Sequence, residues 1–116
     1  MVCTSIEQSK KLLELGIDIT TADMWWNIGI GGYSGPSCVS VSDVDIPAWS
    51  LSALLELIPE SINDYTNNFS QLEITKKSIS YVYADGRLRI GYLKSNLLDA
   101  AFEIVCWLLT NKLLTI

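Results

Sequence analysis

Three aspartates in the first half of the chain have the type and spacing that carboxylate chemistry requires. Asp43 and Asp45 are separated by one residue, and Asp23 is the preceding acid. Paired carboxylates can act as general acid and base, or bind magnesium. Aspartates at this spacing are also common in exposed loops, because Asp is rarely fully buried. We therefore interpret these three first as solvated or capping residues, and second as a small-molecule or catalytic site beside Trp25 and Trp26.

The stretch 24-MWWNIGIGGYSGPS-37 has the glycine content of a phosphate-binding loop. A P-loop also needs a lysine that reaches the phosphates, and there is no Lys or Arg between Trp25 and Lys76. A dinucleotide-binding fingerprint needs a G-x-G-x-x-G spacing followed by a helix. Gly29, Gly31 and Gly32 lack that spacing and precede a strand-like segment. The stretch is therefore predicted to be the loop of a β-hairpin.

The chain contains no histidine, which removes the commonest general base and the commonest metal ligand. Ser-His-Asp and Cys-His catalysis are excluded. The cysteines, Cys3, Cys38 and Cys106, are widely spaced and form no C-x-x-C motif, which matches neither a disulfide framework nor a zinc site. We expect free, buried thiols, no metal, no cofactor and no enzymatic activity.

Four tryptophans, Trp25, Trp26, Trp49 and Trp107, are many for a chain of 116 residues. Most buried aromatic residues serve core packing, but tryptophan is also enriched at the energetic centres of protein interfaces. Trp25 and Trp26 are adjacent on a predicted strand, so their side chains point to opposite faces. One of the two should lie away from the core, which makes the four tryptophans a candidate interface or ligand groove.

Charge and composition exclude several classes of protein. The net charge is −5, and the eight Lys and Arg residues are spread thinly, so direct binding to nucleic acid is not expected. The longest apolar run, 104-IVCWLL-109, is far shorter than the ~18 residues that a membrane span needs. The first fifteen residues also lack the pattern of a secretion signal. We expect a cytoplasmic protein that contacts neither nucleic acid nor membrane.

Local patterns predict three helices and a short helical turn over 22–24. Thr4 and Glu7 have the spacing of a capping box, followed by a helix to Leu15 that ends at Gly16. The other two helices are expected over 50–58, between a Ser50 cap and Pro59, and over 97–113, capped by Ser95 or Asn96. The last helix is apolar on almost every side. Its narrow polar stripe is expected to face solvent and consists of Asp99, Glu103, Cys106 and Thr110.

Alternating residues predict two hairpins. The first pairs 25–30 with 38–44, and the second pairs 79–83 with 88–92 through an Asp-Gly turn. The segment 60–71 is polar and is expected to be a loop. The order is therefore helix, hairpin, helix, hairpin, helix. This order indicates one α+β domain over 1–116, a two-layer sandwich of three helices and two antiparallel β-hairpins.

Three blocks resemble a known family when taken together. They are 4-TSIEQSKKLLELGID-18 with 20-TTADM-24, 47-PAWSLSALLELIP-59 and 98-LDAAFEIVCWLL-109. In these blocks the chain resembles small uncharacterised proteins of Bacteroides-type gut bacteria, often encoded in prophages or other mobile elements. The resemblance implies a bacterial, phage-related setting. That family has no assigned activity, so the resemblance supplies no catalytic residues.

The composition favours association with another chain. Charged residues make up 18% of the chain, against about 25% in typical soluble domains. We expect a non-enzymatic accessory or interaction protein that forms a homodimer. The alternatives are a small-molecule-binding domain or carboxylate-dependent enzyme with its site beside Trp25, and an inhibitor that docks on a host or phage enzyme.

Overall fold

The structure is a computed structural model that describes residues 2–63 and 69–114. Its helices and strands, in chain order, are α1 (Ile6–Glu14), the 3₁₀ helix η1 (Ile19–Thr21), β1 (Met24–Gly29), β2 (Gly32–Ser37), β3 (Ile46–Ala48), α2 (Leu51–Leu57), β4 (Ser61–Asn63), β5 (Phe69–Ile74), β6 (Ser78–Tyr83), β7 (Leu88–Leu93) and α3 (Leu97–Thr110). The strands form two antiparallel sheets, ordered β2-β1-β3 and β4-β5-β6-β7. The fold is an α+β sandwich, as the sequence predicts.

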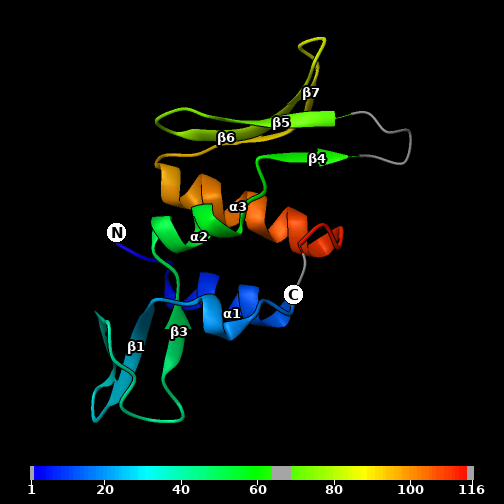
Figure 1. Ribbon diagram of the computed structural model, residues 1–116. Coiled ribbons are helices and arrows are strands. Elements are labelled where there is room, and N and C mark those ends of the chain that lie inside the picture. Colours follow the sequence, from blue (N-terminus) through cyan, green and yellow to red (C-terminus); the bar gives the residue numbers. More distant parts are fainter. Residues whose placement is uncertain (1, 64–68, 115–116) are drawn as a thin grey trace.

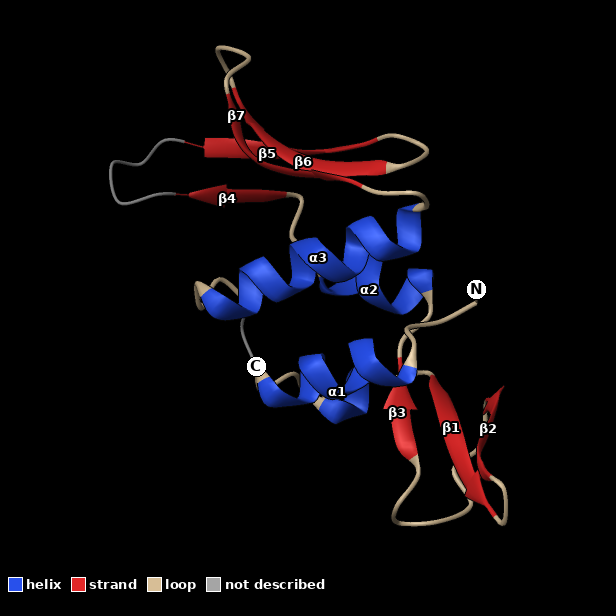
Figure 2. Ribbon diagram, turned by 180° about the vertical axis from the view of Figure 1, so that it is seen from behind, coloured by secondary structure: helices blue, strands red, loops and turns tan. Residues whose placement is uncertain are grey.

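The two sheets lie at opposite ends of the molecule (Figures 1 and 2). The four-stranded sheet lies along α3 and α2, α1 lies on the other side of these helices, and the three-stranded sheet extends away beyond α1. The radius of gyration is 15.3 Å, whereas about 13 Å is typical of a compact chain of this length. We call residues 24–48, which form the three-stranded sheet and its loops, the arm.

Helix α1 begins one residue later than the sequence predicts. The capping box is formed by Ser5 and Gln8, whose side chains each accept a hydrogen bond from the other's backbone amide. Thr4 cannot serve as the cap because it is buried, and its hydroxyl accepts a hydrogen bond from the Trp49 amide at 3.1 Å. The predicted end is confirmed, since Gly16 has a φ of 87° and donates its amide hydrogen to Leu13.

The first hairpin differs from its prediction. β2 is formed by the Gly/Pro stretch itself, and the predicted strand over 38–44 is a loop. An edge strand tolerates proline, and β2 is bulged against β1 near Pro36. Gly35 has a φ of 117°, a conformation that favours glycine. The short helical turn also lies earlier than 22–24, as η1.

The second half agrees with the sequence except before β5. Helix α2 has the predicted Ser50 cap, and the β6–β7 hairpin has the predicted Asp-Gly turn. Helix α3 begins at the predicted Asn96 cap but ends at Thr110, three residues before the predicted end, because Lys112 has a positive φ of 56° that the helix cannot contain. The predicted loop over 60–71 is wrong for β4 and for the start of β5, which pair at one edge of the sheet. Residues 64–68 of that segment lie outside the described residues.

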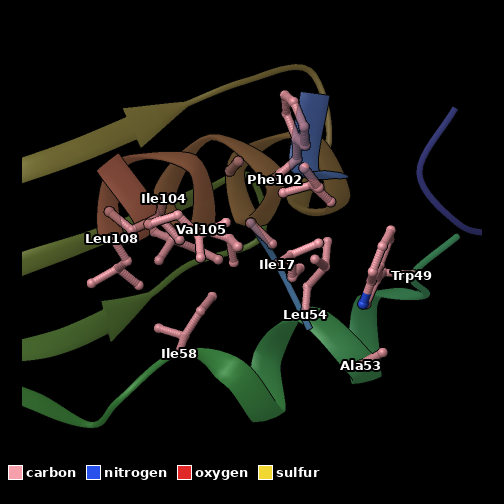
Figure 3. Close-up of a cluster of buried hydrophobic side chains, with 14 of the residues drawn as sticks. Ile17, Trp49, Ala53, Leu54, Ile58, Phe102, Ile104, Val105 and Leu108 are labelled. Atoms are coloured by element: carbon pink, nitrogen blue, oxygen red, sulfur yellow. The ribbon is translucent and has the colours of Figure 1, made fainter. Parts of the chain in front are cut away.

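The core lies between the four-stranded sheet and the helices. Figure 3 shows Leu54 and Ile58 near α2 facing Val105 and Leu108 of α3, with Trp49 at the end of the cluster. Helix α3 contributes the most buried residues, because it packs on the sheet on one side and on α2 on another. The apolar composition of the last helix is thus explained within one chain.

Candidate functional site

The four tryptophans are distributed over the molecule. Trp49 is fully buried in the core, where its indole N–H donates to the Thr21 hydroxyl at 2.9 Å. Trp107 of α3 is half-buried beside Tyr81, with ring centroids 6.4 Å apart, and the Arg89 guanidinium lies 5.7 Å from its ring. Trp107 therefore lies apart from the arm, which holds Trp25 and Trp26, whereas Trp49 directly follows the arm and is buried in the core.

Trp25 and Trp26 lie on opposite faces of β1, as the alternation predicts. Trp26 shares its face with Ile28, and pairing across the sheet places Tyr33 of β2 and Ile46 of β3 on that face as well. The Tyr33 hydroxyl donates to the Val44 carbonyl at 3.5 Å, which brings the backbone of Val44 to the Tyr33 side chain. We call Trp26, Ile28, Tyr33, Val44 and Ile46 the apolar face.

The apolar face is uncharged and open at its outer end. Ile28 is 42% exposed, Tyr33 37% and Val44 57%. Trp26 and Ile46 close the inner end, where the Trp26 indole N–H donates to the Thr4 carbonyl at 3.0 Å. β1, β2 and β3 contain no charged residue at all. Such a face can exchange water for another apolar surface without removing a charge from solvent.

Asp45 holds the arm together from the opposite face. Its carboxylate accepts hydrogen bonds from the amides of Ile28 (2.9 Å), Val41 (2.8 Å) and Ser42 (3.0 Å), and from the Asn27 side chain (2.9 Å). Asp45 is buried, so of the two expected roles, solvated or capping, the structure shows the capping role. The carboxylate is a capping group for loop 38–45, which it fastens to β1.

These hydrogen bonds determine what Asp45 can do chemically. The bond from the Ile28 amide lowers the pKa of the Asp45 carboxyl most, and burial opposes it. The bonds from Val41, Asn27 and Ser42 lower the pKa further, to about 2. A carboxyl with that pKa holds no proton at neutral pH and is a weak base, so Asp45 is poorly suited to general acid–base catalysis.

A groove of about 390 Å³ lies beside Trp25. This is the region in which the sequence predicts a ligand site as the alternative. We call the groove the Trp25 groove. Its lining combines side chains of the arm with side chains of the two preceding helices, namely Leu13, Ile19, Trp25, Ser40, Ser42, Asp43, Asp45 and Pro47. The structure thus brings Trp25 together with Asp43 and Asp45. Trp26 lies on the other face of the strand.

Asp23 does not join this group. Its carboxylate accepts hydrogen bonds from the Ser50 amide at 2.8 Å and from the Ser50 hydroxyl, immediately before α2. Asp23 is therefore a capping residue, as expected. Asp43 is exposed, and no Lys or Arg in the described residues lies within ion-pair distance of it.

The polar stripe of α3 is partly covered from Asp99 to Cys106, so the expected exposure to solvent is wrong there, whereas Thr110 is exposed as expected. The Gln8 side-chain amide donates to the Asp99 carboxylate at 3.0 Å, and Asp99, Glu103 and Cys106 are all half-buried. Burial raises the pKa of the Cys106 thiol to about 12, and Glu103 raises it as well. This thiol is therefore unreactive at neutral pH.

All three cysteines are free thiols, but Cys38 is exposed, so the prediction of burial is wrong there. Cys3 is fully buried. No three metal-ligating side chains gather within residues 2–63 and 69–114.

A scan against models of protein families, a search of curated proteins and a search of solved structures each found no match to this chain. Within the described parts of the chain, no helix is both long enough and apolar enough to cross a membrane.

Sequence reasoning missed the roles of Asn27 and Asp45. Asn27 appears in the sequence only as the polar member of an alternating strand, yet its side chain donates to the Val39 carbonyl at 3.1 Å as well as to Asp45. The usable signal is the S-V-S-D-V-D segment, because Ser and Asp side chains commonly accept hydrogen bonds from nearby amides.

Proposed function

We propose that the chain is a non-enzymatic interaction protein that forms a homodimer through the apolar face of its arm. It acts in the bacterial cytoplasm as an accessory protein of a prophage or mobile element. The resemblance of three sequence blocks supports that setting. The observation that carries the dimer is the exposure of Ile28, Tyr33 and Val44 on a face without charges.

Electrostatics favours this face for a second copy. Two identical chains, each with a net charge of −5, repel one another. The repulsion is smallest where the meeting surfaces carry no carboxylate. The two acids of the arm, Asp43 and Asp45, line the Trp25 groove on the other side of β1. A two-fold axis would place the same apolar residues against each other, which is the geometry of most homodimers.

The exposed edge of the arm also supports association. β2 is an edge strand without a charged residue. Natural edge strands usually carry lysines or other charges that discourage pairing with another chain. β2 has Pro36 and a bulge at one end, which limit pairing there, but Gly32–Ser34 lack such protection.

Sedimentation equilibrium at micromolar concentration tests the proposal. We expect a dimer for the unmodified chain and a monomer for Ile28→Asp, which places a charge in the interface. Leu88→Asp is the matched control, because Leu88 is 64% exposed on the other sheet and the charge change is the same. A monomeric unmodified chain, or equal weakening by both variants, contradicts the proposal.

The alternative functions give different results in the same experiment. If the chain is an inhibitor that binds another enzyme through the apolar face, the isolated chain is a monomer. Ile28→Asp then weakens its binding to that enzyme. A small-molecule-binding protein is favoured by the Trp25 groove, and its binding is insensitive to Ile28→Asp. Thermal-shift measurements with nucleotides and divalent metals distinguish this function from the dimer.

A further inference from the structure

The Trp25 groove has two walls of different chemistry. Trp25 and Pro47 are cross-strand partners on β1 and β3, and with Leu13 and Ile19 they make an apolar wall with an aromatic ring. The other part of the lining is polar and comes from the loop before β3, through Ser40, Ser42, Asp43 and Asp45. A ligand that suits both walls has an apolar part and a polar end.

The polar wall carries uncompensated negative charge. Asp45 is ionised at neutral pH, but its oxygens already accept hydrogen bonds from the arm. Asp43 is exposed and has no basic residue within ion-pair distance in the described parts of the chain. No lysine or arginine occurs from Trp26 to Thr75, so the neighbouring sequence supplies no cation either. The charge of the groove therefore favours a cationic occupant.

We propose that the Trp25 groove binds an arginine side chain presented by a partner protein. The planar guanidinium stacks on the indole of Trp25, and its N–H groups donate to the Asp43 carboxylate. The methylene stem of the arginine packs against Leu13 and Ile19. This binding is independent of the homodimer, because the groove and the apolar face lie on opposite sides of β1.

Other classes of ligand fit the groove less well. A metal ion needs several ligands, and Asp43 is the one carboxylate here whose oxygens are not taken up by hydrogen bonds within the described residues. An anion such as phosphate meets two carboxylates and no basic side chain of the lining. The volume, about 390 Å³, is near the lower end for ligand pockets and is large enough for one long side chain.

The test uses a capped tripeptide, acetyl-Gly-Arg-Gly-amide, and its citrulline counterpart, which has the same shape and no charge. The indole N–H signal of Trp25 in ¹⁵N-labelled protein reports on the groove. We expect the arginine peptide to shift this signal saturably, and the citrulline peptide to bind about fivefold more weakly or worse. Added salt should weaken the arginine peptide and leave the citrulline peptide unchanged.

Substitutions test whether the arginine peptide binds in the groove or is only attracted to an acidic protein. Asp43→Asn should weaken the arginine peptide by about fivefold. Glu56→Gln makes the same charge change at an exposed position on α2 and should alter binding by less than about twofold. Trp25→Phe keeps a stacking ring and should bind more tightly than Trp25→Leu, as reported by the Asp43 amide.

The proposal is overturned if the Trp25 signal does not respond saturably to the arginine peptide. It is also overturned if citrulline binds equally well, or if Glu56→Gln weakens binding as much as Asp43→Asn does. Repeating the titration on Ile28→Asp keeps the two proposals distinguishable. If Ile28→Asp is a monomer and still binds the arginine peptide, both proposals stand. If the unmodified chain is a dimer and does not bind the peptide, only the proposal of arginine binding is overturned.

Discussion

The two antiparallel sheets of this molecule use their faces in different ways. The four-stranded sheet buries Ile62, Ile79 and Tyr81 against the helices, and it carries charged residues in β5 and β7 and at its turns. The three-stranded sheet has no charge in any strand, and its apolar residues at the outer end remain exposed. The helices cover one face of the four-stranded sheet, and its exposed apolar residues, such as Leu88, lie on a sheet whose strands and turns also carry charges. The exposed apolar residues of the three-stranded sheet lie on strands without any charge, which is why we assign association to the arm.

The largest expected effect comes from the core beneath the four-stranded sheet. Ile104 of α3 is fully buried, so Ile104→Ala should reduce the free energy of unfolding by about 2–5 kcal/mol. Leu88→Ala, at an exposed position of β7, should change it by less than about 0.5 kcal/mol. Urea denaturation measures both. A small loss for Ile104→Ala would show that this sheet is not the stable half.

The rates at which the cysteines react with a thiol reagent compare the arm with the rest of the molecule in the unmodified chain. With a thiol reagent at pH 8, Cys38 in the arm should react at once, because it is exposed. Cys3 is fully buried, and burial raises the pKa of the Cys106 thiol to about 12, so both should react only after unfolding. Rapid reaction of Cys106 in the native protein would contradict the packing of α3.

Removing the charge of Asp45 should loosen the arm and leave the body intact. Asp45→Asn keeps the shape but loses the carboxylate that accepts from Ile28, Val41 and Ser42. Exchange of these three amide hydrogens should accelerate by roughly an order of magnitude, because bonds to charged groups are stronger than neutral ones. Amides of α3 should exchange at unchanged rates. Equal acceleration in α3 would mean that the arm and the body unfold together.

The smallest expected effect is the acid response of the arm. The pKa of Asp45 is about 2 in the folded chain, below the ordinary value of 3.8. A depressed pKa means that the carboxylate stabilises the arm fully above about pH 5, and that this contribution is lost as the pH falls through 3.8 toward 2. The side-chain carboxyl ¹³C signal of Asp45 should titrate near pH 2. A midpoint near 4 would show that the hydrogen bonds are not formed.

The elements that the sequence predicts well are those that local interactions determine. The Ser50 cap, the stop before Pro59 and the Asp85-Gly86 turn each depend on residues within a few positions, and the structure has all three. The Gly16 terminus of α1 belongs to the same class. Capping and turn chemistry are local, so pattern and spacing suffice for them.

The elements that the sequence misses depend on distant partners. β2 is a strand because β1 pairs with it, although Gly35 and Pro36 are typical of a loop. β4 and β5 are rich in polar residues, and β6 supplies the pairing for β5. Asp45 is buried because loop 38–45 returns to β1. Non-local pairing overrides local propensity at each of these positions.

The most direct test of association through the arm is an isotope-filtered NOE spectrum of a mixture of labelled and unlabelled chains. Such a spectrum detects contacts between copies and ignores contacts within one copy. We predict cross-peaks that connect Ile28 of one copy with Tyr33 or Val44 of the other, and none from Leu88 or Leu93. Cross-peaks confined to the four-stranded sheet, or no cross-peaks from the arm at concentrations where sedimentation shows a dimer, would contradict the claim.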